Sequence, residues 1–271
     1  MVITPLLLAT TTGAALTLFT LALSQPRLPK RQNFAGLTIP TSAGLALLPI
    51  ILAMLIGSLA GLLDIGEGGV AYLVYSLAAG FVGFADDRWG GAGDKGIAGH
   101  LGALWRGRVT TGLLKVVVLG GGALLFGVIM FGVGWRALVA AFLLAGCANL
   151  ANLFDVRPGR ALKFLGVLVV VALFVAPYGA VLTACGVVGG IGALFYFDLK
   201  GRIMLGDAGA AIWGAVLGYL AVTSGPGAVW WVAGVAIAGL TVVAEFSSIS
   251  RVIEEVGALR RFDHWGRGGD E

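Results

Sequence analysis

Two adjacent carboxylates, Asp86 and Asp87, stand directly after the uncharged apolar segment 70–85. A bare charge beside hydrocarbon is energetically costly, so a carboxylate pair at this place requires a favourable partner. Such a pair is suited to binding a metal ion, pairing with a cationic group or transferring a proton. We therefore take Asp86 and Asp87 as candidate catalytic residues.

A second polar group ends another apolar segment. Asn149, Asn152 and Asp155 are spaced three residues apart, which places them on one face of a helix. Three oxygen-bearing side chains in a row are suited to a substrate or a metal ion, and Asp155 is a further candidate catalytic residue. A seam of hydrogen bonds between two helices is the alternative interpretation.

Asp207 lies between Gly206 and Gly209 at the start of an apolar segment. A helix N-cap would explain an aspartate here without any function. The flanking glycines, however, allow the backbone to approach a ligand closely. A hard carboxylate suits Mg²⁺, which takes few protein ligands and shares phosphate oxygens. Asp207 is therefore the candidate metal ligand.

Candidate anion-binding groups accompany these acids. Lys115 lies inside the start of an apolar segment, where it either extends back to the interface or balances an anionic head group. Arg157 and Arg160 follow Asp155 in a polar connection and are suited to a diphosphate. Thr41 offers a hydroxyl group near exposed backbone N–H groups at a predicted helix start, and an ordinary helix start without a bound anion is the alternative interpretation.

The composition excludes a water-soluble domain. Hydrophobic residues make up 58% of the 271-residue chain, charged residues only 12%, and the mean hydropathy is +0.97. No polar block is large enough for a second domain, and no nucleic-acid partner is expected. Cys147 and Cys185 lie in apolar stretches and support neither a disulfide framework nor a zinc site. We expect one membrane domain over residues 1–271, with helices in 1–247 and a cytoplasmic tail in 248–271.

The chain divides into about nine apolar segments, which predicts an all-α, multi-pass membrane protein. The predicted spans are 5–24, 41–63, 70–85, 111–133, 137–154, 164–176, 180–197, 208–222 and 228–246.

Alternation of these segments across a bilayer gives a consistent topology. With the N-terminus outside and the C-terminus in the cytoplasm, Arg136 is the only one of the 18 Lys and Arg residues that falls outside. The same assignment brings the candidate acids to the cytoplasmic face of the cell membrane.

The order of these motifs resembles the polyprenyl-phosphate phosphosugar-1-transferase family, which includes the enzyme that makes lipid I. The resemblance covers residues 33–218. The matching pieces are Asn33-Phe34 with Ile39-Pro40-Thr41, Gly83-Phe84-Ala85-Asp86-Asp87, Gly112-Leu113-Leu114-Lys115, Asn149 with Asn152 and Asp155, and Gly206-Asp207-Ala208-Gly209.

The resemblance implies Mg²⁺-dependent transfer of a sugar-1-phosphate from a UDP-sugar to a polyprenyl phosphate such as undecaprenyl phosphate, with release of UMP. The lipid product would serve synthesis of a cell-envelope polysaccharide or peptidoglycan. Asp207 would bind the metal, Asp86 and Asp87 would be the paired acids, and Lys115 would contact phosphate. His264 loosely matches the family's histidine-rich loop, where it would bind substrate. A homodimer is compatible with the sequence.

Two departures from the family pattern motivate a different class of function. Asp155 is followed by Val156 instead of the family's glycine, and His264 is a single histidine where the family has several. The alternative is a non-catalytic scaffold or regulator that binds polyprenyl phosphate. A secondary transporter would require ionisable groups near the membrane midplane between inverted repeats, and the sequence has neither.

Overall fold

The computed structural model describes residues 3–90, 102, 105, 107 and 110–267. It is 80% helical, so the predicted all-α class is confirmed. The described strands are β1 (Lys30–Gln32) and β2 (Thr38–Pro40), which pair antiparallel with Arg31 opposite Ile39.

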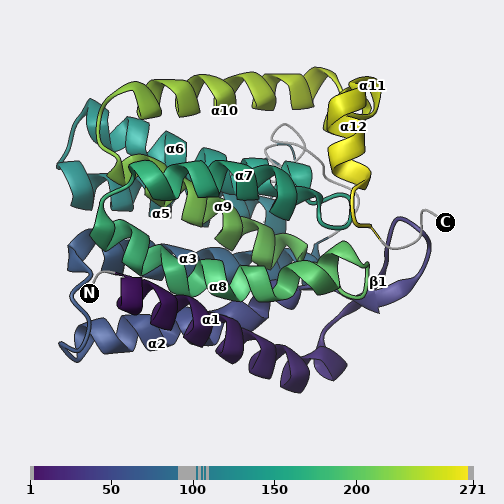
Figure 1. Ribbon diagram of the computed structural model, residues 1–271. Coiled ribbons are helices and arrows are strands. Elements are labelled where there is room, and N and C mark those ends of the chain that lie inside the picture. The colour runs from purple at the N-terminus through teal and green to yellow at the C-terminus, as the bar shows by residue number, and fades with distance from the viewer. Residues whose placement is uncertain (1–2, 91–101, 103–104, 106, 108–109, 268–271) are drawn as a thin grey trace.

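The long helices form a bundle with approximately parallel axes (Figure 1). Short 3-10 helices η1 (Gln25–Arg27) and η2 (Ala43–Leu47) flank the β1–β2 hairpin. The α-helices are α1 (Ile3–Ser24), α2 (Leu48–Leu59), α3 (Gly66–Trp89), α5 (Thr111–Phe131), α6 (Trp135–Phe154), α7 (Arg160–Val175), α8 (Tyr178–Leu199), α9 (Gly206–Thr223), α10 (Ala228–Phe246), α11 (Ile249–Glu255) and α12 (Gly257–His264).

Each of the nine predicted apolar segments contains one of these helices, but not every helix is long enough to cross a bilayer. Within the described residues, α1, α3, α5, α6 and α8 are long and apolar enough to span a membrane. The number is six if α10 and α11, which meet at 98°, form one broken span. A span requires about 20 residues, whereas α2 has 12 and α7 has 16. The nine spans and the orientation of the termini stay predictions.

Helix α9 lies inside the bundle, and its residues 206–222 are buried except for the half-buried Asp207. It contacts α3, α6, α7 and α8. Small residues allow these close approaches: a Cβ on Gly214 would lie 2.2 Å from the backbone oxygen of Cys147 in α6. The interior of this protein is therefore organised around a helix that meets other helices on every side.

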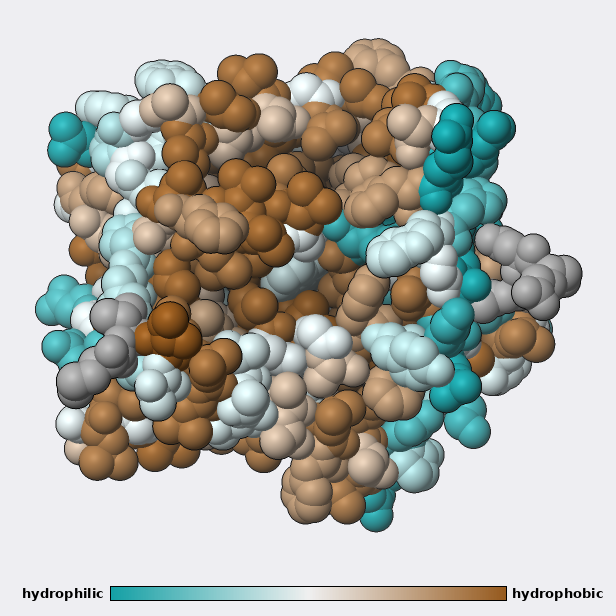
Figure 2. Space-filling model, in the orientation of Figure 1, coloured by the Kyte–Doolittle hydropathy of each residue, from teal (hydrophilic) through white to brown (hydrophobic). Residues whose placement is uncertain are grey.

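Chain direction brings the polar helix ends together. One end of the bundle carries the hairpin and α12. Helices α3, α6 and α8 end there, and helices α5, α7 and α9 begin there. Figure 2 shows an apolar surface over the middle of the bundle, with hydrophilic residues gathered along that end. This arrangement fits the prediction that the acids share one face of the membrane.

The described part of the predicted C-terminal tail is folded. After α10 the chain forms α11 and α12, and α12 lies across the start of α7 (Figure 1). The tail thus contributes packed structure to the polar end of the bundle.

Candidate functional site

Asp87 is the most completely bound of the predicted acids. It lies in the last turn of α3, and it is only 8% exposed. Its Oδ2 accepts a hydrogen bond of 2.8 Å from the Ser42 hydroxyl, and its Oδ1 accepts one of 3.1 Å from the backbone N–H of Asp207. The backbone N–H of Ala208 donates to Oδ2 at 3.4 Å. Because the first N–H groups of a helix lack partners within it, Asp87 caps α9 from a different helix.

Close backbone approach makes this contact possible. A Cβ on Gly83, one turn before Asp87, would lie 2.6 Å from the backbone of Asp207 and Ala208, so only glycine lets α3 approach α9 this closely. Ser42 has φ of 61°, the only positive value among non-glycine residues of the described chain. A positive φ is unfavourable for serine, so the surrounding packing must hold the Ser42 backbone in the conformation that lets its hydroxyl group reach Asp87.

Lys115 connects two other acids. Its Nζ lies 2.6 Å from Oδ2 of Asp207 and 4.0 Å from Oδ2 of Asp86. Asp86 also accepts a hydrogen bond of 2.5 Å from the hydroxyl of Thr111. The lysine side chain is only 16% exposed, so one cation neutralises part of the negative charge of two carboxylates in a partly dehydrated site.

Asp155 lies at the C-terminal end of α6 beside the remaining acids. Burial raises its pKa well above the ordinary value, and the charges of Asp198, Asp207 and Asp87 raise it further, against a smaller opposite effect of the Gly206 N–H group. Crowded carboxylates of this kind favour a bound cation.

Asp198, at the end of α8, fixes two loops around the cluster. Its Oδ2 accepts a hydrogen bond of 2.8 Å from the Gly159 N–H group, and its Oδ1 accepts one of 3.1 Å from the Leu205 N–H group. The first loop carries Asp155 and the second leads into Asp207. Asp198 therefore holds the two predicted acids in a fixed relation.

Four of these acids, Asp87, Asp155, Asp198 and Asp207, line a cleft of about 360 Å³ at the polar end of the bundle. The guanidinium carbon of Arg157 lies 5.0 Å from the centre of the Phe34 ring, so a cation and an aromatic ring stand together at this cleft. The lining residues include Arg31, Asn33, Phe34, Thr41, Asp87, Asp155, Arg157, Asp198 and Asp207.

The cleft contains acids that could contribute to a metal site. The only described group of three metal-ligating side chains within 4.8 Å of one another is Glu254, Asp263 and His264, outside the cleft. Mg²⁺ commonly takes one or two carboxylates and completes its shell with water and phosphate oxygens. Asp155 and Asp207 are the candidates among the cleft acids for this role. Both oxygens of Asp87 accept hydrogen bonds from protein groups, whereas the ion pair of Asp207 with Lys115 uses its Oδ2.

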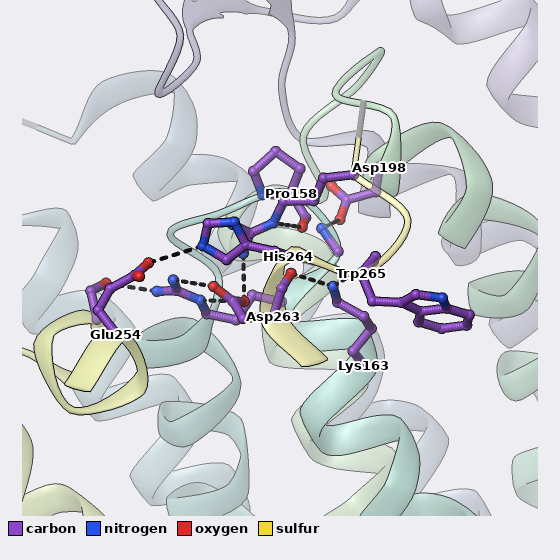
Figure 3. A network of polar contacts seen from close by, with 11 residues as sticks. Pro158, Lys163, Asp198, Glu254, Asp263, His264 and Trp265 are labelled. Carbon is purple, nitrogen blue, oxygen red and sulfur yellow. Dashed lines mark hydrogen bonds and ion pairs between the residues drawn. The ribbon is translucent and has the colours of Figure 1, made fainter. Parts of the chain in front are cut away.

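Arg160 and His264 do not reach the cleft. The Arg160 side chain is fully buried and forms a two-pronged ion pair with Asp263 of α12, with N–O distances of 2.9 and 2.6 Å. His264 points toward Glu254, with Nε2 3.3 Å from a carboxylate oxygen (Figure 3). Both residues have partners in the C-terminal helices, and their predicted roles in substrate binding stay predictions.

Further contacts complete this C-terminal network, which we call the α12 clasp and define as Arg160, Lys163, Asp263 and Arg267. The Lys163 ammonium group donates to the backbone oxygens of Asp263 and Trp265, the latter at 3.0 Å (Figure 3). Arg267 lies 2.5 Å from Asp263 and donates to the Pro158 oxygen at 3.2 Å. Because Pro158 belongs to the Asp155 loop, the clasp ties the C-terminal helix to that loop.

The predicted row on α6 does not form one surface. Asn149 is exposed, whereas the half-buried Asn152 donates to the Ala148 oxygen at 2.9 Å. Neither asparagine lines the cleft, so of this row only Asp155 does. Their predicted roles in substrate binding have no contact here that supports them.

Four residues that contact or position the acids, and Phe34 at the cleft, were not among the predicted site residues. Ser42 and Thr111 bind Asp87 and Asp86, Asp198 positions the loops, and Arg31 donates to the backbone oxygen of Asp87. Asp198 follows the same rule that selected Asp155, since both end an apolar segment at the same side of the bundle. The other three carry no comparable signal, because hydroxyl groups and arginines at helix ends are common.

A scan against models of known protein families and a search of curated proteins both find no match. The family resemblance of the motifs therefore stays a prediction, and the function has to be argued from the site itself.

Proposed function

We propose that this protein transfers a sugar-1-phosphate from a UDP-sugar to a polyprenyl phosphate at the cytoplasmic face of the cell membrane. The observation that carries the proposal is the convergence of Asp86, Asp87, Asp155 and Asp207 with Lys115 at the polar end of an apolar bundle. A lipid phosphate reaches such a place with its chain in the bilayer, while a nucleotide arrives from water. Nine spans, with the N-terminus outside and the C-terminus inside, belong to this proposal.

In the proposed reaction, an oxygen of the lipid phosphate attacks the phosphorus attached to the sugar. The bond from that phosphorus to the bridging oxygen breaks, and UMP leaves with the bridging oxygen. Both reactants are anions, so the site must offset charge repulsion and hold them in line. A bound Mg²⁺ would neutralise phosphate charge, with Asp207 and Asp155 as its protein ligands.

Other residues in or beside the cleft serve positioning. Lys115 lies between Asp86 and Asp207 and is suited to contact a phosphate oxygen that enters between them. Arg157 and Phe34 offer a cation and a ring face to the nucleotide. Asp87 keeps α3 and the start of α9 together, so its contribution to the reaction is the placement of Asp207.

One feature favours a second candidate, a non-catalytic protein that binds polyprenyl phosphate. Asp87 and Asp207 already have partners within the chain, namely Ser42 and Lys115. Acids used in this way would hold the bundle together without chemistry. The two candidates differ in turnover and not in lipid binding.

The deciding experiment incubates the purified protein with undecaprenyl phosphate, Mg²⁺ and a panel of UDP-sugars, and measures UMP and the lipid product. The proposal expects turnover with at least one sugar, dependence on Mg²⁺, and loss of turnover in Asp207→Asn. Glu254→Gln, an exposed acid outside the cleft, is the matched control and should keep activity. Tight binding of undecaprenyl phosphate without turnover over the whole panel would favour the second candidate.

A further inference from the structure

A groove separate from the acidic cleft lies where α1 and α3 end. It measures about 700 Å³ and is bounded by η1, the start of the hairpin and η2. Its apolar lining comes from Leu23, Leu28, Leu45 and Phe84. Its cations are Arg27, Lys30 and Arg88, all of which are exposed. No carboxylate is among the described residues that line it.

The groove combines two environments that an amphiphile requires. Its walls include the last two turns of α1, a helix long and apolar enough to cross a membrane, so an acyl chain can lie against them. Its three cations stand at the polar end of that helix, where head groups would lie when α1 crosses the bilayer as proposed. Basic pockets between membrane helices on the cytoplasmic side are suited to anionic head groups.

A hydroxyl group adds a further donor. The Oγ atom of Ser24, which lines the groove, is buried and has no hydrogen-bond partner among the described residues. Arg27 donates to the Leu23 oxygen at 3.0 Å through one nitrogen, which leaves its remaining N–H groups for a ligand. A phosphate oxygen in the groove would accept from Arg27, whereas the Ser24 hydroxyl becomes a donor only if its side chain turns toward the groove.

We propose that this groove binds an anionic glycerophospholipid, with its phosphate among Arg27, Lys30 and Arg88 and an acyl chain against Leu23 and Phe84. The charge of the lining decides between classes of lipid, because a zwitterionic lipid would bring a cation into a site that already has three. The site is independent of the proposed transferase reaction, since none of its residues lines the acidic cleft.

The test is native mass spectrometry of the detergent-solubilised full chain, titrated with phosphatidylglycerol or with phosphatidylcholine of the same acyl chains. The wild type should retain phosphatidylglycerol at a concentration about tenfold below that needed for phosphatidylcholine, since each basic residue near a lipid phosphate adds a favourable charge interaction. The triple variant Arg27→Gln, Lys30→Gln, Arg88→Gln should lose this preference.

A matched triple variant separates a built site from general attraction. Arg251→Gln, Arg260→Gln and Arg261→Gln remove the same charge from exposed positions on α11 and α12, and should leave the preference unchanged. Equal loss in both triple variants would overturn the proposal, as would an unchanged preference in the groove variant.

A second variant keeps every charge. Leu23→Trp narrows the groove from a side chain that is 56% exposed, so the core stays intact, and it should lower phosphatidylglycerol retention several-fold. Thermal unfolding in the same detergent checks that each variant is folded. Displacement of phosphatidylglycerol from the groove by farnesyl phosphate at equal concentration would assign the groove to a prenyl phosphate and overturn the proposal.

Discussion

The α12 clasp offers the sharpest test of how the C-terminal helix is held. Arg160 and Asp263 are both fully buried, and two hydrogen bonds with N–O distances of 2.9 and 2.6 Å join them. Asp263→Ala leaves the Arg160 guanidinium buried with Ser250 as its remaining partner, at 2.6 Å. Breaking a buried ion pair in this way costs about 3–5 kcal/mol, because a charge stays buried without compensation. We expect the thermal midpoint in detergent to fall by on the order of 10 °C.

Replacing both partners should cost far less than replacing one. In the double variant Arg160→Met, Asp263→Leu the Arg160 charge is removed together with its partner, while Arg267 loses its carboxylate and keeps its hydrogen bond to the Pro158 oxygen. The double variant should therefore be more stable than Asp263→Ala and less stable than the wild type. Glu254→Gln, which breaks the half-exposed pair with His264, is the control and should cost less than about 1 kcal/mol. A midpoint of Asp263→Ala equal to that of the wild type, or a double variant as unstable as Asp263→Ala, would refute the reasoning.

Three further predictions follow from the contacts of the site. Gly83→Val should lower the thermal midpoint by several degrees and reduce turnover, because its side chain would lie against the backbone of α9; Gly120→Val, with open space at its Cβ, is the control. Lys115→Met should abolish measurable UMP release while the far-ultraviolet circular dichroism stays unchanged; full activity would exclude a phosphate contact. Burial alone would raise the pKa of Asp263, but Arg160 and Arg267 outweigh it and lower the pKa, so its stabilising effect is present above about pH 4 and is lost as the pH falls through the folded-state pKa. The thermal midpoints of the wild type and the double variant are compared from pH 3 to 8. Below about pH 4 the midpoint of the wild type should fall relative to that of the double variant, because only the wild type loses the stabilising effect of Asp263.

The hydrophobic pattern located the helices well because each apolar run must form its own backbone hydrogen bonds in a membrane. It could not give their lengths. Segment 41–63 begins with η2 and continues as the 12-residue α2, since Ser42 turns toward Asp87 before the helix starts. The end of an apolar run in sequence is thus not the end of a helix in space.

The acids were found because a carboxylate at the end of an apolar segment has few favourable surroundings. The same reasoning could not separate Arg157 from Arg160, which are three residues apart in one connection. Arg157 stays in the loop beside Phe34, whereas Arg160 begins α7 and turns to Asp263, 103 residues further along the chain. A partner so distant in sequence leaves no local signal, and this is why the substrate role predicted for Arg160 lacks support.

The position of α9 has a consequence for biosynthesis. Of the helices that surround it, α3, α6, α7 and α8 are all made earlier, and only α10 among its long neighbours follows. The earlier helices must therefore enter the membrane without their central contact, and α9 has to move between them afterwards. Because α9 is not among the five described helices that are apolar and long enough to span alone, we expect its insertion to depend on the assembled neighbours. A ribosome-bound chain ending before α9 should accordingly be inserted but unassembled, and accessible to membrane proteases until Gly206–Thr223 emerges.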